Sequence, residues 1–391
     1  MRVLAARTAL MAKTPPRAPA AVTPAAVASA AVALAAMALA AVALSAKCLA
    51  SQRMPPTQHP AGTSYQAVFT QYSPLFSNAE ILRRLLSPLA GKAVRDSLAQ
   101  SLEAMTPYPV DLTKERFLVY VPTGPPPSPR GFALFVFVPP WDEPRLPFGW
   151  AAQLDRYGVI FVTPAAAGNT AAVLSRRVPL ALAAEENLVR QYPIDRGRIY
   201  VGGFSGGSRV ALRIALDYPD IFRGAILNAG ADPLGDAHPL PPRDLFLRFQ
   251  SSSRLVFITG DRDTSSLASD ASSSQSMQDW CVFDVETYET PDVGHELMSP
   301  AAFGRALDRL LHPTPPDPKR LRACRSRVEA ELGEKLDRAQ ALVSKSSHPP
   351  ACRLLLEIDK RYGGLAAPRI LELAHESRCE PGAGADQPPS F

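Results

Sequence analysis

The residues with the clearest potential for chemistry surround Ser205, in the stretch GGFSGG at positions 202–207. An apolar run, residues 199–203, precedes this serine, and a segment with helical spacing, residues 206–217, follows it. A serine at the centre of Gly-x-Ser-x-Gly, on a sharp strand-to-helix turn, can act as a nucleophile. The same letters also occur in flexible Gly-Ser loops. The prediction therefore needs a base, an acid and oxyanion donors elsewhere in the chain.

A candidate base follows the last predicted strand. Of the six histidines, only His238 and His295 lie in predicted loops of the strand-containing region after Ser205. His295 comes next to Gly294, just after the final strand, which places it at the carboxyl edge of a parallel sheet. His238 lies in a proline-rich loop without such a placement. We predict His295 as the base, with a surface histidine of no catalytic role as the alternative.

A candidate acid lies between the serine and this histidine in chain order. The apolar run at residues 255–259 continues into Gly260-Asp261-Arg262-Asp263. Either aspartate could hold the imidazole, and the other reading of each is an Asx-type turn or an ion pair with Arg262. We favour Asp263, because Asp261 is placed to cap the glycine turn. The order is then Ser205, Asp263, His295.

The oxyanion donors are predicted from backbone positions. Gly206 would begin the helix after Ser205, where the N–H is free and the helix dipole favours negative charge. The second donor is expected after the strand at residues 132–138, which continues into Pro139-Pro140-Trp141. Prolines have no N–H, so Trp141 occupies the matching place. The alternatives for Trp141 are a wall for an acyl or aryl group and simple core packing.

The elements that must position these residues alternate between strands and helices. The longer strands are continuous apolar runs, typical of strands covered on both faces. The alternation predicts an α/β fold, a mainly parallel sheet covered by helices. Expected strands cover residues 116–121, 132–138, 158–162, 199–203, 224–228, 255–259 and 282–288, and expected helices cover 181–191, 206–217, 243–250 and 300–311.

Composition divides the chain into segments. We predict a linker at 51–63, an N-terminal helical segment at 64–112, the strand-containing domain at 113–312, a small all-helical C-terminal domain at 313–380 and a disordered tail at 381–391. A capping box, Ser77 to Glu80, begins a helix in the N-terminal segment, and a second helix is expected over 92–105. In the C-terminal domain, helical spacing predicts one long helix from about Leu321, one over 350–362 and one from Pro368.

Charge argues against a nucleic-acid partner. The formal net charge is +5, but six basic residues and no acidic residue lie within the first 53 positions. The rest of the chain is close to neutral, whereas a nucleic-acid surface needs a clustered basic face. We therefore expect no nucleic-acid partner. The sequence leaves the oligomeric state open.

The N-terminal 50 residues predict an export signal or a membrane anchor. A basic section is followed by an uncharged stretch, Ala25–Ala46, composed almost entirely of Ala, Val, Leu and Met. Its length also suffices for one bilayer-spanning helix, which would associate the protein with a membrane. A lipid-modified Cys48 and a disordered leader are the other readings. All but the last predict a location outside the cytoplasm: periplasmic, secreted or anchored at the cell envelope.

Cysteines fit an exported protein. Apart from Cys48, the chain has Cys281, Cys324, Cys352 and Cys379, which allow three disulfide connectivities. If the last two helices are antiparallel neighbours, Cys352 meets Cys379, and we prefer this pairing. The alternative for Cys281, beside Trp280, is a buried free thiol.

Three segments resemble a known family. Residues 190–207 (RQYPIDRGRIYVGGFSGG) and 218–225 (YPDIFRGA) look like the central block of polyhydroxybutyrate-depolymerase-like and feruloyl-esterase-like α/β-hydrolases, and residues 115–122 (ERFLVYVP) resemble their opening strand. Gly260-x-x-Asp263 and Gly294-His295 match their acid and base signatures. The resemblance covers about residues 115–312. One departure is that these families carry His-Gly-Cys or a similar sequence where this chain has Pro139-Pro140-Trp141.

The resemblance implies an α/β-hydrolase fold and an extracellular serine ester hydrolase that uses no metal or organic cofactor. Its substrate would be a small or polymeric ester. Two other functions stay open. One is a catalytically inactive hydrolase fold that serves as an envelope binding protein, which the altered proline turn favours. The other is a serine peptidase of the prolyl-peptidase type.

Overall fold

The computed structural model describes residues 61–100, 106–235 and 237–379. The predicted export segment, most of the predicted linker and the predicted disordered tail lie outside these ranges. Across the described ranges, no helix has the length and apolar character needed to cross a membrane.

A single eight-stranded sheet forms the centre, in the order β1-β2-β4-β3-β5-β6-β7-β8. β1 pairs antiparallel with β2, and β2 with β4, while β3 to β8 are parallel to one another. This topology confirms the predicted α/β fold with a mainly parallel sheet. The strands are β1 (Ser64–Ala67), β2 (Phe117–Tyr120), β3 (Phe132–Val138), β4 (Val159–Pro164), β5 (Ile194–Phe204), β6 (Gly224–Asn228), β7 (Arg254–Gly260) and β8 (Val285–Thr290).

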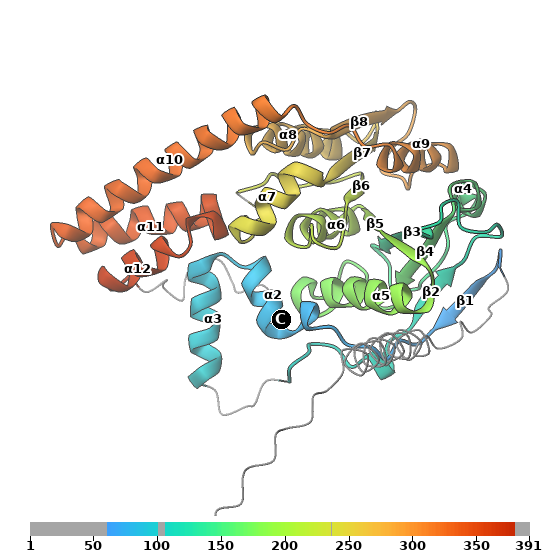
Figure 1. Ribbon diagram of the computed structural model, residues 1–391, viewed down its shortest axis with the longest axis horizontal. Coiled ribbons are helices and arrows are strands. Elements are labelled where there is room, and N and C mark those ends of the chain that lie inside the picture. The colour runs from blue at the N-terminus through green and yellow to red at the C-terminus, as the bar shows by residue number, and fades with distance from the viewer. Residues whose placement is uncertain (1–60, 101–105, 236, 380–391) are drawn as a thin grey trace, which may run out of the picture. The chain divides into compact units, whose positions relative to one another are not determined.

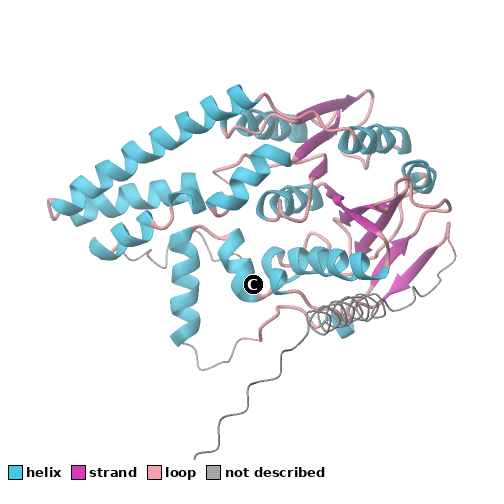
Figure 2. Ribbon diagram, viewed as in Figure 1, coloured by secondary structure: helices cyan, strands magenta, loops and turns pink. Residues whose placement is uncertain are grey.

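Helices cover both faces of the sheet (Figures 1 and 2). Every residue of β3 is buried, which explains its uninterrupted apolar sequence. Alternate side chains, such as Phe135 and Phe137, face α4 (Trp150–Tyr157) and α9 (Pro300–Leu311). The others belong to the opposite core, with α5 (Val178–Gln191) and α6 (Gly206–Asp217). Between α4 and α9, the rings of Trp150 and Phe303 stack with centroids 3.8 Å apart.

The N-terminal segment differs from the prediction because it contains a strand. β1 joins the sheet through β2, so the sheet begins at Ser64 and the predicted boundary at residue 113 is wrong for it. The remainder is helical as expected, with α2 (Asn78–Leu85) and α3 (Pro88–Gln100). Ser77 caps α2 by accepting from the Glu80 N–H at 3.3 Å. The Glu80 carboxylate pairs with Arg83 and Arg84 rather than with the Ser77 N–H, so the predicted capping box is only half formed.

The C-terminal region is helical, as predicted, with α10 (Pro318–Ser344), α11 (His348–Tyr362) and α12 (Arg369–Glu376). The preferred Cys352–Cys379 disulfide is confirmed. The reading of Cys281 as a free thiol is wrong, because Cys281 forms a second disulfide with Cys324 of α10. This bond joins the C-terminal helices to the end of α8 (Thr264–Asp279), a helix that the sequence did not predict. Helix α4 was also not predicted.

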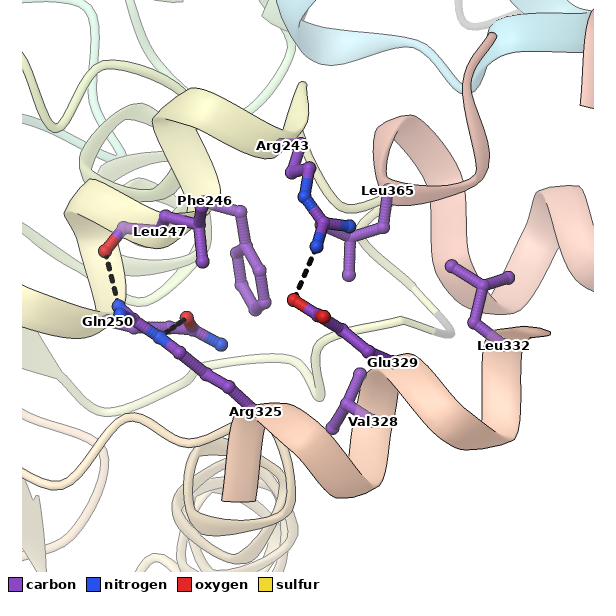
Figure 3. Close-up of a pocket in the computed structure, with 9 residues that line it drawn as sticks. All are labelled: Arg243, Phe246, Leu247, Gln250, Arg325, Val328, Glu329, Leu332 and Leu365. Carbon is purple, nitrogen blue, oxygen red and sulfur yellow. Dashed lines mark hydrogen bonds and ion pairs between the residues drawn. The ribbon is translucent and has the colours of Figure 1, made fainter. Parts of the chain in front are cut away.

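Helix α10 also packs against α7 (Arg243–Ser252) through polar contacts (Figure 3). The Arg325 guanidinium donates to the Leu247 carbonyl oxygen and to Gln250 Oε1, both at 2.7 Å. Arg243 forms an ion pair with Glu329. The cavity between these side chains measures about 20 Å³, which is room for about one water molecule. This region is therefore a helix–helix contact rather than a ligand site.

We predict that the Cys281–Cys324 bond stabilises the folded protein against unfolding. The double variant Cys281→Ala/Cys324→Ala should lose ~2–4 kcal/mol of unfolding free energy, because the bond closes a long loop in the unfolded chain. Urea titrations monitored by circular dichroism would measure the loss. Cys352→Ala/Cys379→Ala is the matched control, and should lose slightly less because its sequence separation is 27 rather than 43 residues. An unchanged urea midpoint in the first variant would contradict the prediction.

Candidate active site

Ser205 occupies the tight turn between β5 and α6. Its φ and ψ angles are 55° and −123°, a conformation that residues with side chains rarely adopt. The turn is held to the neighbouring strand, because the Ser205 N–H donates to the Asn228 carbonyl oxygen at 2.9 Å. This strained geometry is that of a nucleophile elbow, which lifts the hydroxyl above the carboxyl edge of the sheet.

Two glycines allow the turn to fit. A Cβ atom at Gly203 would lie 2.2 Å from the Gly207 carbonyl oxygen, and one at Gly207 would lie 2.1 Å from the Val138 carbonyl oxygen. Both contacts are with backbone, which cannot rotate aside as a side chain can. The glycines on either side of Ser205 therefore let the start of α6 approach the end of β3.

The three predicted side chains lie in hydrogen-bond contact. His295 Nε2 is 2.9 Å from Ser205 Oγ, and His295 Nδ1 is 2.5 Å from Asp263 Oδ2. They come from three loops at the same sheet edge, after β5, β7 and β8. The structure thus brings together the serine, histidine and aspartate in the order needed for proton transfer. Their catalytic roles stay predictions.

Asp263 is suited to orient a histidine. Burial alone raises the pKa of Asp263, but hydrogen bonds from His295, Ser266 and Ser265 outweigh it and lower the pKa to about 2. The carboxylate is therefore ionised at neutral pH, where it can fix the imidazole tautomer and stabilise an imidazolium. Asp263 also caps α8, since its Oδ1 accepts from the Ser266 N–H at 3.2 Å.

Asp261 and His238, the alternative acid and base, are not part of the hydrogen-bonded set of Ser205, His295 and Asp263. Asp261 is exposed, and its N–H donates to the Thr290 carbonyl oxygen at 3.0 Å. Arg262 forms an ion pair with Asp292 rather than with either neighbouring aspartate. His238 is buried, and burial lowers its pKa to about 3, so the ring is neutral at physiological pH.

The proline turn after β3 is fixed by bonds from the loop that follows β4. The Asn169 N–H donates to the Pro140 carbonyl oxygen at 3.1 Å, which orients the peptide plane that carries the Trp141 N–H. The Ala166 N–H donates to the Asp142 carbonyl oxygen at 2.7 Å, and the Gly168 N–H donates to Asp142 Oδ1 at 2.9 Å. The turn is therefore rigidly held beside α6. Donation from Trp141 and Gly206 to an oxyanion stays a prediction.

The indole of Trp141 contributes an aromatic surface beside the site. Its ring centroid is 6.0 Å from that of Phe137 in the core and 6.4 Å from that of Phe204. The Phe204 ring in turn lies 5.1 Å from the His295 ring. The Arg145 guanidinium covers the indole at 4.0 Å. Core packing of Trp141 is therefore observed, and its position also suits a wall for an apolar substrate group.

Asn228 is a supporting residue that the sequence did not reveal. It ends β6 and is 1% exposed. Its Nδ2 donates to the Ile258 carbonyl oxygen at 2.9 Å, and its Oδ1 accepts from the Met298 N–H at 2.8 Å. Asn228 thus ties β7 to the loop that carries His295. A buried amide at the end of an apolar strand is the one sequence signal that could have indicated this role.

In the described ranges, no group of three or more His, Cys, Asp or Glu side chains is arranged to hold a metal ion. The site's polar groups are instead the proton-transfer set of serine, histidine and aspartate.

The strand order together with the serine turn decides the fold. The chain has the α/β-hydrolase fold. An alignment over 100 residues shows 30% identity to poly(3-hydroxybutyrate) depolymerase from Ralstonia pickettii and covers 22% of this chain. The chain spans about a fifth of that relative's length, since the match covers 20% of it. This similarity agrees with the family resemblance of the motifs. No family model matches the chain.

Two solved structures align with about half of the chain. Est1E from Butyrivibrio proteoclasticus is 14% identical with a TM-score of 0.38, and the alignment covers 52% of this chain and 95% of that one. Acetyl xylan esterase from Aspergillus awamori is 13% identical with a TM-score of 0.39, over 51% of this chain and 95% of that one.

We predict that Asp263, and not Asp261, supports His295. Asp263→Asn should lower kcat by about 10²–10⁴-fold, because an amide cannot stabilise the imidazolium. Asp261→Asn is the matched control and should leave kcat unchanged, since this side chain is exposed. Steady-state hydrolysis of a p-nitrophenyl ester would measure both. Equal losses in the two variants would refute the assignment.

The lowered pKa of Asp263 also predicts a pH dependence of stability. Its ionised form stabilises the folded protein fully above the unfolded pKa of about 3.9, and this contribution is lost as the pH falls through about 2. Wild type should therefore be more stable than Asp263→Asn at pH 5, and the difference should shrink between pH 4 and pH 2. A difference in urea midpoint that is constant with pH would contradict this.

The two glycines after Ser205 should respond differently to a methyl group. In Gly206→Ala, the methyl carbon meets Oδ1 of the exposed Asn169 side chain at 2.3 Å, and this side chain can rotate away. In Gly207→Ala, it meets the Val138 backbone, so the turn must move. We expect Gly207→Ala to lose about 10²-fold or more in kcat and Gly206→Ala to lose clearly less. Thermal melts would check that both variants fold, and the opposite ranking would contradict the packing argument.

Proposed function

We propose that the protein is a serine carboxylic-ester hydrolase. The observation that carries this proposal is the unbroken hydrogen-bond chain from Ser205 Oγ through His295 to Asp263, on a strained turn at the start of a helix. Backbone strain of this kind costs free energy and is found mainly at functional sites. The match to poly(3-hydroxybutyrate) depolymerase supports ester chemistry in particular.

In the first half of the reaction, Ser205 Oγ attacks the ester carbonyl carbon while His295 Nε2 takes the hydroxyl proton. The carbonyl electron pair moves onto oxygen, where the N–H groups of Gly206 and Trp141 would stabilise it. The tetrahedral species then collapses and expels the alcohol, which receives the proton from His295. Asp263 stabilises the imidazolium throughout.

In the second half, water takes the place of the alcohol. His295 Nε2 removes a water proton as the oxygen attacks the acyl carbon, and the resulting species expels Ser205 Oγ, which regains its proton from His295. The side chain of His295 is 47% exposed, so water has direct access to it. The products are a carboxylic acid and free enzyme.

The surroundings of Ser205 favour an apolar group next to the scissile bond. Trp141 and Phe204 form an aromatic surface beside His295. Such a surface suits short aliphatic or aryl acyl groups, and the exposure of His295 leaves room for a larger ester. A panel of p-nitrophenyl esters of increasing acyl length, together with polyester particles, would separate small from polymeric substrates.

We also propose that the protein works outside the cytoplasm. The Cys281–Cys324 and Cys352–Cys379 disulfides support this location, because disulfides persist in oxidising compartments. Cell fractionation followed by immunoblotting would test it, with recovery in the cytoplasmic fraction as the contrary result.

Ser205→Ala tests the proposed function directly. Loss of the hydroxyl should lower kcat/KM for p-nitrophenyl butyrate by ~10³-fold or more, because no acyl-enzyme can form. A fluorophosphonate probe should label wild type and leave Ser205→Ala unlabelled. Absence of labelling and hydrolysis in wild type would instead support the inactive binding protein. Cleavage of proline-containing peptides in preference to esters would support the peptidase.

A further inference from the structure

Arg177 is a buried cation that the mechanism above does not use. It ends a helical turn at Val173–Arg177, directly before α5, and is 3% exposed. Burying a guanidinium is costly unless it is paired or well hydrogen-bonded. Within the described residues, no carboxylate lies within ion-pair distance of Arg177, and its Nε has no hydrogen-bond partner. The cost of burying Arg177 therefore needs an explanation.

The guanidinium binds two backbone carbonyls from different elements. Arg177 Nη2 donates to the Pro139 oxygen at 2.8 Å, and Nη1 makes a longer bond to the Gly206 oxygen at 3.4 Å. Pro139 lies two residues before Trp141, and Gly206 itself carries the other predicted oxyanion donor. One side chain thus bridges the two segments whose N–H groups must converge.

The sequence of the turn explains why such a bridge is needed. Pro139 and Pro140 have no N–H, so neither residue can anchor this turn by donating a hydrogen bond. Its carbonyls are held from outside instead: that of Pro140 by Asn169 and that of Pro139 by Arg177. Arginine suits the task because its fixed fork of donors reaches two acceptors at once.

The charge of Arg177 persists at neutral pH. Burial lowers the pKa of this guanidinium to about 10, with the Asp142 carboxylate acting in the opposite direction. A buried positive charge beside the first residue of α6 adds to the helix dipole there. The charge of Arg177 and the helix dipole both stabilise negative charge that develops during the reaction, and both have little effect on a neutral ester.

We propose that Arg177 is a positioning residue of the oxyanion hole, which sets the separation between the Trp141 and Gly206 N–H groups by binding the Pro139 and Gly206 carbonyls. This inference rests on the proposed ester hydrolase function. It assigns to Arg177 an effect on the transition state rather than on substrate binding.

The test compares Arg177→Met with wild type, with kcat expressed per active site titrated by a fluorophosphonate. We expect kcat to fall by about 10–10²-fold and KM to stay within about twofold, because the donors are displaced rather than removed. The affinity for a trifluoromethyl ketone, which forms an oxyanion on Ser205, should fall in proportion to kcat/KM. Arg177→Lys keeps the charge and reaches one carbonyl, so it should recover part of kcat.

Arg213→Met is the matched control. Arg213 is a largely buried arginine of α6 that donates to the Leu85 carbonyl oxygen at 2.7 Å, on the side of the helix that faces the N-terminal segment. This variant should lower the melting temperature and leave kcat per titrated site unchanged. If Arg177→Met does not fold, Arg177→Lys carries the test, with a fall in kcat at a near-wild-type melting temperature as the expected result.

The two possible failures are distinguishable. If wild type hydrolyses esters and both Arg177 variants retain wild-type kcat per titrated site, the positioning role is overturned and the ester hydrolase stands. If the ketone affinity stays at the wild-type value while kcat falls, Arg177 acts elsewhere and the proposal also fails. If wild type neither hydrolyses esters nor binds the ketone, the proposed function itself fails and Arg177 loses this role with it.

Discussion

The close packing of the start of α6 against the end of β3 is the constraint on which the candidate site depends. Side chains at Gly203 and Gly207 would overlap with backbone atoms 2.2 and 2.1 Å away, so only glycine permits this approach. The approach brings the proline turn next to Gly206, and the turn between β5 and α6 holds Ser205 in a strained conformation. The close packing at the two glycines therefore fixes the position of the Ser205 hydroxyl group.

The carboxyl edge of the sheet is held together by bonds between loops rather than by the strands alone. Asn228 joins β6 to β7 and to the histidine loop. The Arg262 N–H donates to the Val293 carbonyl oxygen at 3.0 Å, which ties the loop of Asp263 to that of His295. These hydrogen bonds between loops explain how Ser205, Asp263 and His295 stay within hydrogen-bond distance of one another. Without them, each loop could adopt many conformations, and the gain in conformational entropy would favour their separation.

Strands β3 and β6 have the predicted bounds, because strands buried on both faces must be apolar throughout. The contact among Ser205, Asp263 and His295 was also predictable, since each of them lies in the segment that follows a strand at the same sheet edge. Helix α8 was not predicted because its sequence is rich in serine. Its buried positions include Ser266, Asp270 and Ser273, so the sequence has no apolar stripe that would indicate a helix. Strand β1 is a short, half-exposed edge strand. The contacts of Asn228 and Arg177 join residues far apart in the chain, so no spacing encodes them.

The partial exposure of His295 has a chemical consequence. In the proposed esterase, the acyl-enzyme meets bulk solvent as soon as the alcohol departs, and access does not depend on the opening of a lid by the described residues. Whatever nucleophile is abundant in the solvent would then take the acyl group. In water the outcome is hydrolysis, whereas in alcohol-rich mixtures the same serine would transfer its acyl group to the alcohol and synthesise new esters.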